Sequence, residues 1–277
     1  MMMKRRNLSL SIMITGHHGI GKSTFINRLF NRFIIPENSS LVPREDIDIY
    51  IIEISCDGIK RKVNIVDTPG LGYRLDDTQI HENIINFIRG QYDLFLAEET
   101  KIKRNPEFED TRVHCLLYFI SPSTHGLKLM DNKFLQKVNG LVNIIPIIGK
   151  ADGLTTNELH IARSKMKSQF TEYGIKICDF MDDQEIYMTT IPPSQINELI
   201  PFAVCTGGIS SVENKKMERQ YEWGVPLTEN STHNDFSILK EILLNGYCEY
   251  LIESTVSVFY EKYRTQILTE ILPNGEK

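Results

Sequence analysis

The stretch "GHHGIGKST" at residues 16–24 decides the fold class of this 277-residue chain. It fits the pattern G-x-x-x-x-G-K-[ST], whose glycines let the backbone curl around phosphate oxygens with successive N–H groups pointing at them. A strand-like run at residues 8–14 comes before it, and apolar side chains at helical spacing follow it at residues 25–33. A strand before and a helix after favour a phosphate-binding loop over a chance glycine-rich turn.

Two polar side chains of this loop have roles that phosphate chemistry defines. Lys22 is placed to reach the β- and γ-phosphates of a nucleoside triphosphate, and Ser23 offers its hydroxyl to Mg²⁺. The residues that we expect to contact the nucleotide in this loop are Gly16, His18, Gly19, Ile20, Gly21, Lys22, Ser23 and Thr24.

A second motif, "VNIVDTPG" at residues 63–70, ends a predicted strand in Asp67. An acidic group at the carboxyl end of a strand faces the crevice where ligands bind in parallel sheets, so Asp67 is expected to hold Mg²⁺ through water. Gly70 has no Cβ, and its N–H can therefore approach the γ-phosphate. After a phosphate loop, this motif indicates a GTPase rather than an ordinary turn.

A third motif, "IIGKAD" at residues 147–152, ends another buried strand and resembles the guanine-reading [NTAG]-K-x-D element of P-loop GTPases. The carboxylate of Asp152 can accept both the N1–H and the 2-amino group of guanine, whereas adenine offers neither donor. The stem of Lys150 can lie over the nucleotide. Gly149 stands where an asparagine would offer one more hydrogen bond.

The composition narrows the class of protein. A net charge of −5 argues against nucleic-acid binding, and 41% hydrophobic residues allow one large core. The five cysteines are widely spaced without a C-x-x-C pair, which indicates reduced thiols and no zinc site. Because no run reaches membrane-spanning length and no signal peptide is recognised, we expect a soluble cytoplasmic protein.

Short strand-like runs alternate with longer helical runs, which predicts an α/β fold with a mixed, mostly parallel sheet and helices on both faces. We expect an antiparallel hairpin at the sheet edge and a charged, irregular insertion at residues 93–111. Strands are expected at residues 8–15, 47–54, 61–66, 113–120 and 142–148, and in "FAVC" after Pro201. Helices are expected at residues 23–33, 80–91, 127–138, 155–173, about 235–250 and 252–266.

Longer stretches resemble the septins, a family of P-loop GTPases with a Ras-like fold. They are "RVHCLLYFISPSTHGLKLMDNKFL", "GKADGLT", "ERQYEWGVPLTENSTHNDFSILKEILL" and "YEKYR". The third of these resembles the septin unique element, and the likeness covers about residues 7–268. It implies a short basic segment at 1–7, a GTPase core at 8–208, a septin unique element at 209–268 and a tail at 269–277 without a coiled coil.

The resemblance also assigns residues outside the three motifs. It makes Arg219 a base-contacting arginine and brings Gly207 or Gly208 close to the guanine. His125 would reach toward the nucleotide of a partner subunit, and Trp223 would anchor the same nucleotide face. For His125 an ordinary surface position is the alternative, and for Trp223 it is core packing.

The resemblance implies GTP or GDP with Mg²⁺ as ligands and other septin subunits as hetero-oligomer partners. A second copy of this chain could also pair through the nucleotide face. Septins form filaments that act in cytokinesis and cortical organisation, at septin rings or the cell cortex of the division site. Lys4, Arg5 and Arg6 form a small basic cluster that could meet an anionic membrane surface, with a solvated terminus as the equal alternative.

Three departures bear on hydrolysis. Septins that hydrolyse GTP carry a threonine in the first switch, whereas this chain has none between Thr24 and Thr68. His18 could crowd the attacking water or position it, and the alternative is that His17 and His18 both point to solvent. No glutamine follows Gly70 to orient water. We therefore expect a subunit that holds its nucleotide and hydrolyses it slowly or not at all.

Two other functions remain open at this point. One is a catalytically active regulatory GTPase that hydrolyses GTP with Mg²⁺. The other is a membrane-associated relative that pairs through its nucleotide face without polymerising.

Overall fold

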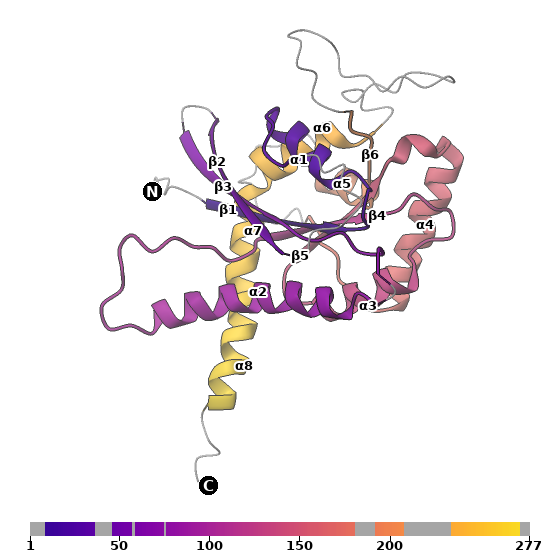
Figure 1. Cartoon of the computed structure of the whole chain (residues 1–277). Coiled ribbons are helices and arrows are strands. Elements are labelled where there is room, and N and C mark those ends of the chain that lie inside the picture. Colours follow the sequence, from indigo (N-terminus) through magenta and orange to yellow (C-terminus); the bar gives the residue numbers. More distant parts are fainter. Residues whose placement is uncertain are drawn as a thin grey trace.

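The computed structural model describes residues 9–36, 46–56, 59–74, 76–180, 192–207 and 234–271 (Figure 1). Its centre is a six-stranded sheet with the order β2-β3-β1-β4-β5-β6. β2 and β3 pair antiparallel and the other neighbours pair parallel, which confirms the predicted mixed sheet with an edge hairpin. The strands are β1 (Ser9–Gly16), β2 (Asp48–Cys56), β3 (Ile59–Asp67), β4 (Cys115–Ile120), β5 (Asn143–Gly149) and β6 (Phe202–Val204).

Helices cover both faces of the sheet, and the strands alternate their side chains between two apolar cores. Ile12 and Ile14 of β1 face one core, whereas Met13 faces the other. This is why the central strands read as continuous apolar runs. The first core is covered by α1 (Lys22–Phe30), α5 (Pro193–Leu199), α6 (Phe236–Glu241) and α7 (Cys248–Ser254), and the second by α2 (Thr78–Glu99), α3 (Leu129–Val138) and α4 (Thr156–Glu172). Figure 1 shows α1 and α6 on the opposite side of the sheet from α2 and α3.

The prediction of an irregular insertion at residues 93–111 was wrong in its first part, which is helical, and one short helix was not predicted. α2 runs eight residues past the expected end at residue 91, because Tyr92 and Leu96 continue a buried stripe that charged neighbours obscure in the sequence. α5 was not predicted, since its start at Pro193 follows another proline and reads as a break. Proline is nevertheless well suited to the first turn of a helix.

The C-terminal helices form one succession rather than two separate helices. α6 and α7 are joined by a π-helical turn at Ile242–Gly246, and a second π-helical turn at Thr255–Tyr260 leads into α8 (Glu261–Ile271). None of the described helices is both long and apolar enough to cross a membrane.

A buried polar network ties this succession to the amino ends of β4 and β5. Asn143 at the start of β5 donates to the carbonyl of His114 at 2.8 Å and accepts from the Ser254 hydroxyl at 3.0 Å. Thr255 donates to the Leu251 carbonyl at 2.8 Å and to the His114 carbonyl at 3.2 Å. The second π-helical turn therefore begins where the helix is bonded to the sheet.

Arg112 also attaches the C-terminal helices, because its guanidinium packs against aromatic rings of both α2 and the second π-helical turn. The guanidinium of Arg112 lies 3.5 Å from the ring centre of Phe95 on α2 and 4.7 Å from that of Tyr260. Asp110 accepts from Arg112 through both carboxylate oxygens, at 2.9 and 2.6 Å. The Tyr260 hydroxyl also donates to Glu99 at the end of α2, so α8 starts from a fixed point on α2.

Candidate functional site

The phosphate-loop motif lies where the sequence predicts it, between the end of β1 at Gly16 and the start of α1 at Lys22. Lys22 is buried, and its Nζ donates to the carbonyls of Gly16 at 3.0 Å and His17 at 3.1 Å. Two backbone carbonyls of the phosphate loop therefore fix the position of the Lys22 ammonium group. Ser23 and Thr24 follow in the first turn of α1, and both remain partly accessible.

Asp67 lies beside the phosphate loop because β3 is the parallel neighbour of β1. The register pairs Asp67 with Ile14, two positions before Gly16, and Asp67 is buried. Thr68 donates both its N–H and its hydroxyl to the Ile14 carbonyl, at 3.2 and 2.8 Å. A serine hydroxyl and a carboxylate are the hard oxygen ligands that suit Mg²⁺, so Ser23 and Asp67 fit the predicted metal.

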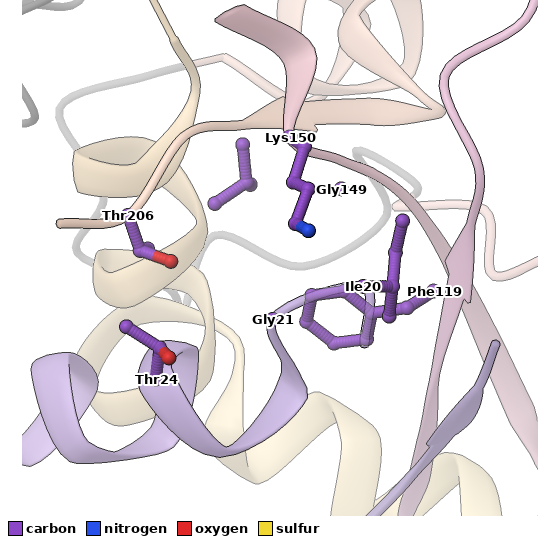
Figure 2. A pocket seen from close by; sticks show the side chains of 8 residues that line it. Ile20, Gly21, Thr24, Phe119, Gly149, Lys150 and Thr206 are labelled. Carbon is purple, nitrogen blue, oxygen red and sulfur yellow. The ribbon is translucent and has the colours of Figure 1, made fainter. Parts of the chain in front are cut away.

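A pocket opens at the carboxyl ends of β4, β5 and β6 (Figure 2). Figure 2 shows the Lys150 side chain extending from the end of β5 into the pocket, while Thr24 of α1 and Thr206 after β6 contribute hydroxyl groups. The third motif lies at this place, since Asp152 is in the short 3-10 turn Ala151–Gly153 directly after β5. The lining residues are Ile20, Gly21, Thr24, Phe119, Gly149, Lys150, Val204 and Thr206.

The structure gives a physical reason for the unexpected Gly149. A Cβ at this position would lie 2.7 Å from Cγ1 of Ile20 and 3.0 Å from its carbonyl oxygen. The branched Ile20 occupies the space that an asparagine side chain would need. The glycine at position 149, which cannot offer the side-chain hydrogen bond of an asparagine, is therefore explained by its packing against Ile20 of the phosphate loop.

Besides Gly149 of the third motif, three lining residues were not among the predicted contacts. Phe119 lies near the end of β4, Val204 ends β6, and Thr206 follows two residues later. The rule that ligands bind beyond the carboxyl ends of parallel strands could have indicated all three. The sequence motifs did not: Phe119 and Val204 lie in stretches recognised as strands, but no motif assigns a nucleotide contact to either of them or to Thr206.

The two loop histidines differ, and the alternative that both point to solvent is wrong. His18 is exposed, with its ring centre 5.8 Å from that of Tyr73. His17 is 9% exposed and contacts Asp131 of α3. The imidazole next to the predicted γ-phosphate position is thus accessible, and the preceding imidazole belongs to the protein interior.

His125 is exposed in the loop before α3. Gln169 of α4 holds this loop from behind, since its side-chain oxygen accepts the N–H of Leu127 at 2.7 Å. A Cβ on Gly126 would lie 2.1 Å from the same oxygen. The loop is therefore fixed against α4, a geometry that fits either a surface histidine or a contact to a partner.

Asp235 holds β6, which leads to the predicted base contact at Gly207 or Gly208, through two hydrogen bonds to Ala203. Its N–H donates to the Ala203 carbonyl and its Oδ2 accepts the Ala203 N–H, both at 2.7 Å. Arg163 of α4 pairs with the same carboxylate and donates to the Pro201 carbonyl at 3.1 Å. Burial raises the pKa of Asp235, and the Arg163 charge opposes that shift.

The predicted contacts that follow β6 lie only in part within the described residues. Gly207 is buried and lies just beyond Thr206. Gly208, Arg219 and Trp223 lie outside the described residues, as do residues 37–45 of the segment between Thr24 and Thr68 and residues 209–233 of the predicted septin unique element.

Comparison with known proteins agrees with this geometry. The family model described as Septin matches residues 6–277. Cell division control protein 11 of Encephalitozoon cuniculi is 42% identical over 268 residues, which cover 97% of this chain and 98% of the relative. The crystal structure of Cdc11 from Saccharomyces cerevisiae is similar with a TM-score of 0.62 and 29% identity, covering 94% of this chain and 100% of that chain.

A septin GTPase domain from Chlamydomonas reinhardtii is similar with a TM-score of 0.71, covering 93% of this chain and 98% of that chain. At 21% identity this likeness supports the fold alone. The family model spans nearly the whole chain, and the Encephalitozoon relative aligns along almost its full length. The chain therefore belongs to the septin family.

Proposed function

We propose that this septin is a filament subunit that acts in cell division, binds GTP or GDP with Mg²⁺, and hydrolyses GTP slowly or not at all. The observation that carries the proposal is the placement of Lys22, Asp67 and Asp152. They follow or end β1, β3 and β5, whose carboxyl ends meet at one edge of the sheet. A single nucleotide at that edge can be contacted by all three.

The chemistry of this edge fits a guanine nucleotide. Lys22 supplies a positive charge at the phosphate loop, and Ser23 with Asp67 supplies oxygen ligands for Mg²⁺, which neutralises phosphate charge when bound. Lys150 extends into the pocket beside Gly149, where its stem can cover the base (Figure 2). Asp152 then offers the carboxylate that distinguishes guanine from adenine.

Weak hydrolysis is proposed from the sequence of the switches. Phosphoryl transfer to water needs groups that orient the attacking molecule. This chain has no threonine between Thr24 and Thr68, and Leu71 rather than a glutamine directly follows Gly70. Bound nucleotide would then act as a structural ligand that stabilises the fold by mass action.

The partners are proposed from the family and from the names of its members. Two similar proteins are named as cell division control protein 11, which supports a role in cell division at a cytoskeletal structure of the division site. Other septin subunits are the proposed partners, with self-pairing through the nucleotide face and contact with anionic membranes as secondary proposals. The fixed loop of His125 fits this docking surface and an ordinary surface position equally.

The nucleotide content of the purified protein tests the proposal. Chromatography after denaturation should recover about one guanine nucleotide per chain and no adenine nucleotide. The Asp152→Asn variant should lose guanine nucleotide and gain affinity for xanthine nucleotides, because an amide can donate to the oxygen that replaces the 2-amino group. An empty wild-type protein that takes up ATP as readily as GTP would refute guanine recognition.

Two further measurements separate the proposed function from its alternatives. Single-turnover incubation with GTP and Mg²⁺ should leave most of the GTP intact after minutes, whereas rapid cleavage would support an active regulatory GTPase. Electron microscopy at low salt, alone and with sibling septins, should show filaments. Pairs that never extend would favour the non-polymerising relative.

A further inference from the structure

His17 joins the phosphate loop to a buried carboxylate on another element. Its Nε2 lies 3.0 Å from Oδ1 of Asp131, the third residue of α3, and Asp131 is 1% exposed. The Tyr118 hydroxyl of β4 donates to the same oxygen at 2.6 Å, and the N–H of Lys128 donates to Oδ2 at 3.0 Å. The carboxylate is thus held in place by β4 and by the start of α3. A carboxylate only accepts hydrogen bonds, so Nε2 of the imidazole is the donor.

The other nitrogen of the imidazole faces the loop that follows β3. A Cβ on Gly72 would lie 2.7 Å from Nδ1 of His17, and Gly72 has a φ of +81°, which favours glycine. The backbones are joined at the same point. Leu71 donates to the Gly16 carbonyl at 3.0 Å, and the N–H of His18 donates to the Leu71 carbonyl at 2.8 Å.

The segment held in this way includes Gly70, whose N–H is expected to reach the γ-phosphate. A Cβ on Gly70 would lie 2.8 Å from Cα of His18, so the glycine rests directly on the phosphate loop. Thr68 bonds the beginning of the segment to Ile14, and Leu71 bonds its end. Gly72 cannot withdraw from the phosphate loop without disturbing its packing against His17, while Thr68 and Leu71 are held by their bonds to Ile14 and Gly16.

We propose that His17 is a positioning residue that fixes residues 68–72 for a γ-phosphate, so that the site retains a nucleoside triphosphate better than it otherwise would. This inference rests on the proposed binding of guanine nucleotide. A loop that is ordered before binding does not lose further conformational freedom when Gly70 contacts the ligand. A nucleoside diphosphate lacks the γ-phosphate that Gly70 would contact, so the ordering of residues 68–72 should increase its affinity less.

The expected effect follows from the type of contact that is removed. A hydrogen bond to a buried charged group is worth about tenfold to a hundredfold in an equilibrium constant. His17→Ala should therefore accelerate dissociation of a triphosphate by about that factor. The effect on a diphosphate should be smaller, because the Lys22 contacts to the loop backbone do not involve the imidazole.

The test compares dissociation rates of fluorescent GDP and of a fluorescent, non-hydrolysable GTP analogue from the full chain, with Mg²⁺ present. The variants are His17→Ala, Asp131→Asn and the double variant. His160→Ala is the matched control, because His160 is an exposed histidine on α4 away from the loop. Thermal unfolding of each variant is measured in parallel.

Four results together are expected. His17→Ala loses the triphosphate faster by about ten- to a hundredfold and the diphosphate by clearly less. Asp131→Asn shows the same preference. The double variant is no faster than the faster single variant, since both changes act on the same contact. His17→Gln, which retains a donor that can reach Asp131, falls between wild type and alanine, and it serves as the main test if the alanine variant does not fold.

Other results would overturn the inference. Equal acceleration of both nucleotides would give His17 only a local structural role. Independent, additive effects of the two single changes would show that His17 does not act through Asp131. If wild-type protein binds no guanine nucleotide at all, the proposed function itself is wrong. If it binds both nucleotides well and His17→Ala behaves like His160→Ala, only the positioning role is wrong.

Discussion

Lowering the pH from 7 to 5 should destabilise this protein through His114. This residue precedes β4, is fully buried, and accepts the N–H of Ser11 on Nδ1 at 2.8 Å. Burial lowers its pKa to about 4 from an ordinary value of 6.5, with Asp110 opposing the shift and Arg112 adding to it. The folded protein therefore keeps His114 neutral at a pH where the unfolded chain protonates it.

The sign and size of the effect follow from this difference. Between pH 6.5 and about 4 the unfolded state binds a proton that the folded state does not, so the free energy of unfolding falls as the pH falls. At about 1.4 kcal/mol per pKa unit, the loss between pH 7 and pH 5 is about 2 kcal/mol. Below the folded pKa the loss levels off at about 3 kcal/mol.

Urea denaturation at pH 7, 6 and 5 with saturating nucleotide measures this loss. His114→Gln removes the titration, so the variant should lose about 2 kcal/mol less stability than wild type over the same range. The raised pKa of Asp235 acts in the opposite direction, but wild type and variant share it. Equal losses in the two proteins would refute the assignment, and His160→Gln controls for loss of an exposed histidine.

Three further substitutions have defined outcomes. Gly149→Asn should displace Ile20 and weaken nucleotide binding by about 1–3 kcal/mol, measured by titration with a fluorescent guanine nucleotide. Asp235→Ala should lower the free energy of unfolding by about 3–5 kcal/mol in denaturant titration, because it leaves the Arg163 charge unpaired; Asp235→Asn should cost less. Arg112→Met should loosen α8 from α2, seen as faster hydrogen exchange across residues 261–271 with little change in the sheet.

The sequence predicted the parts of the fold that depend on local patterns. The strands before Gly16, Asp67 and Gly149 were recognisable because each is an apolar run that ends in a polar motif. Thr155 begins the helix expected at residues 155–173, and it accepts the N–H of Glu158 at the start of α4. Local chemistry is sufficient in these cases, since the ligand-facing residues immediately follow the strands that place them.

Contacts between distant segments were beyond the sequence patterns. His17 and Asp131 are 114 positions apart, and nothing in either neighbourhood indicates that they meet. In the sequence, Gly149 in place of an asparagine is an isolated departure. In the structure, Ile20 fills the space that the asparagine side chain would need. Such pairs are decided by how strands and helices assemble, which periodicity in one segment does not reveal.

The central strands of this septin connect the attachment of the C-terminal helices, at their amino ends, with the candidate nucleotide site at their carboxyl ends. β1 carries Ser11 near one end, bonded to His114, and leads to the phosphate loop at the other. β5 begins at Asn143, bonded to the C-terminal helices, and ends at Gly149 in the pocket. If the C-terminal helices shifted, buried hydrogen bonds at the amino ends of these strands would break, and the carboxyl ends of the same strands carry the residues expected to contact the nucleotide.

Since an interior packed in this way deforms little, nucleotide binding should stabilise the attachment of the C-terminal helices as well as the pocket. Slower hydrogen exchange at residues 248–260 on adding nucleotide would support this coupling, and unchanged exchange there despite full occupancy would contradict it.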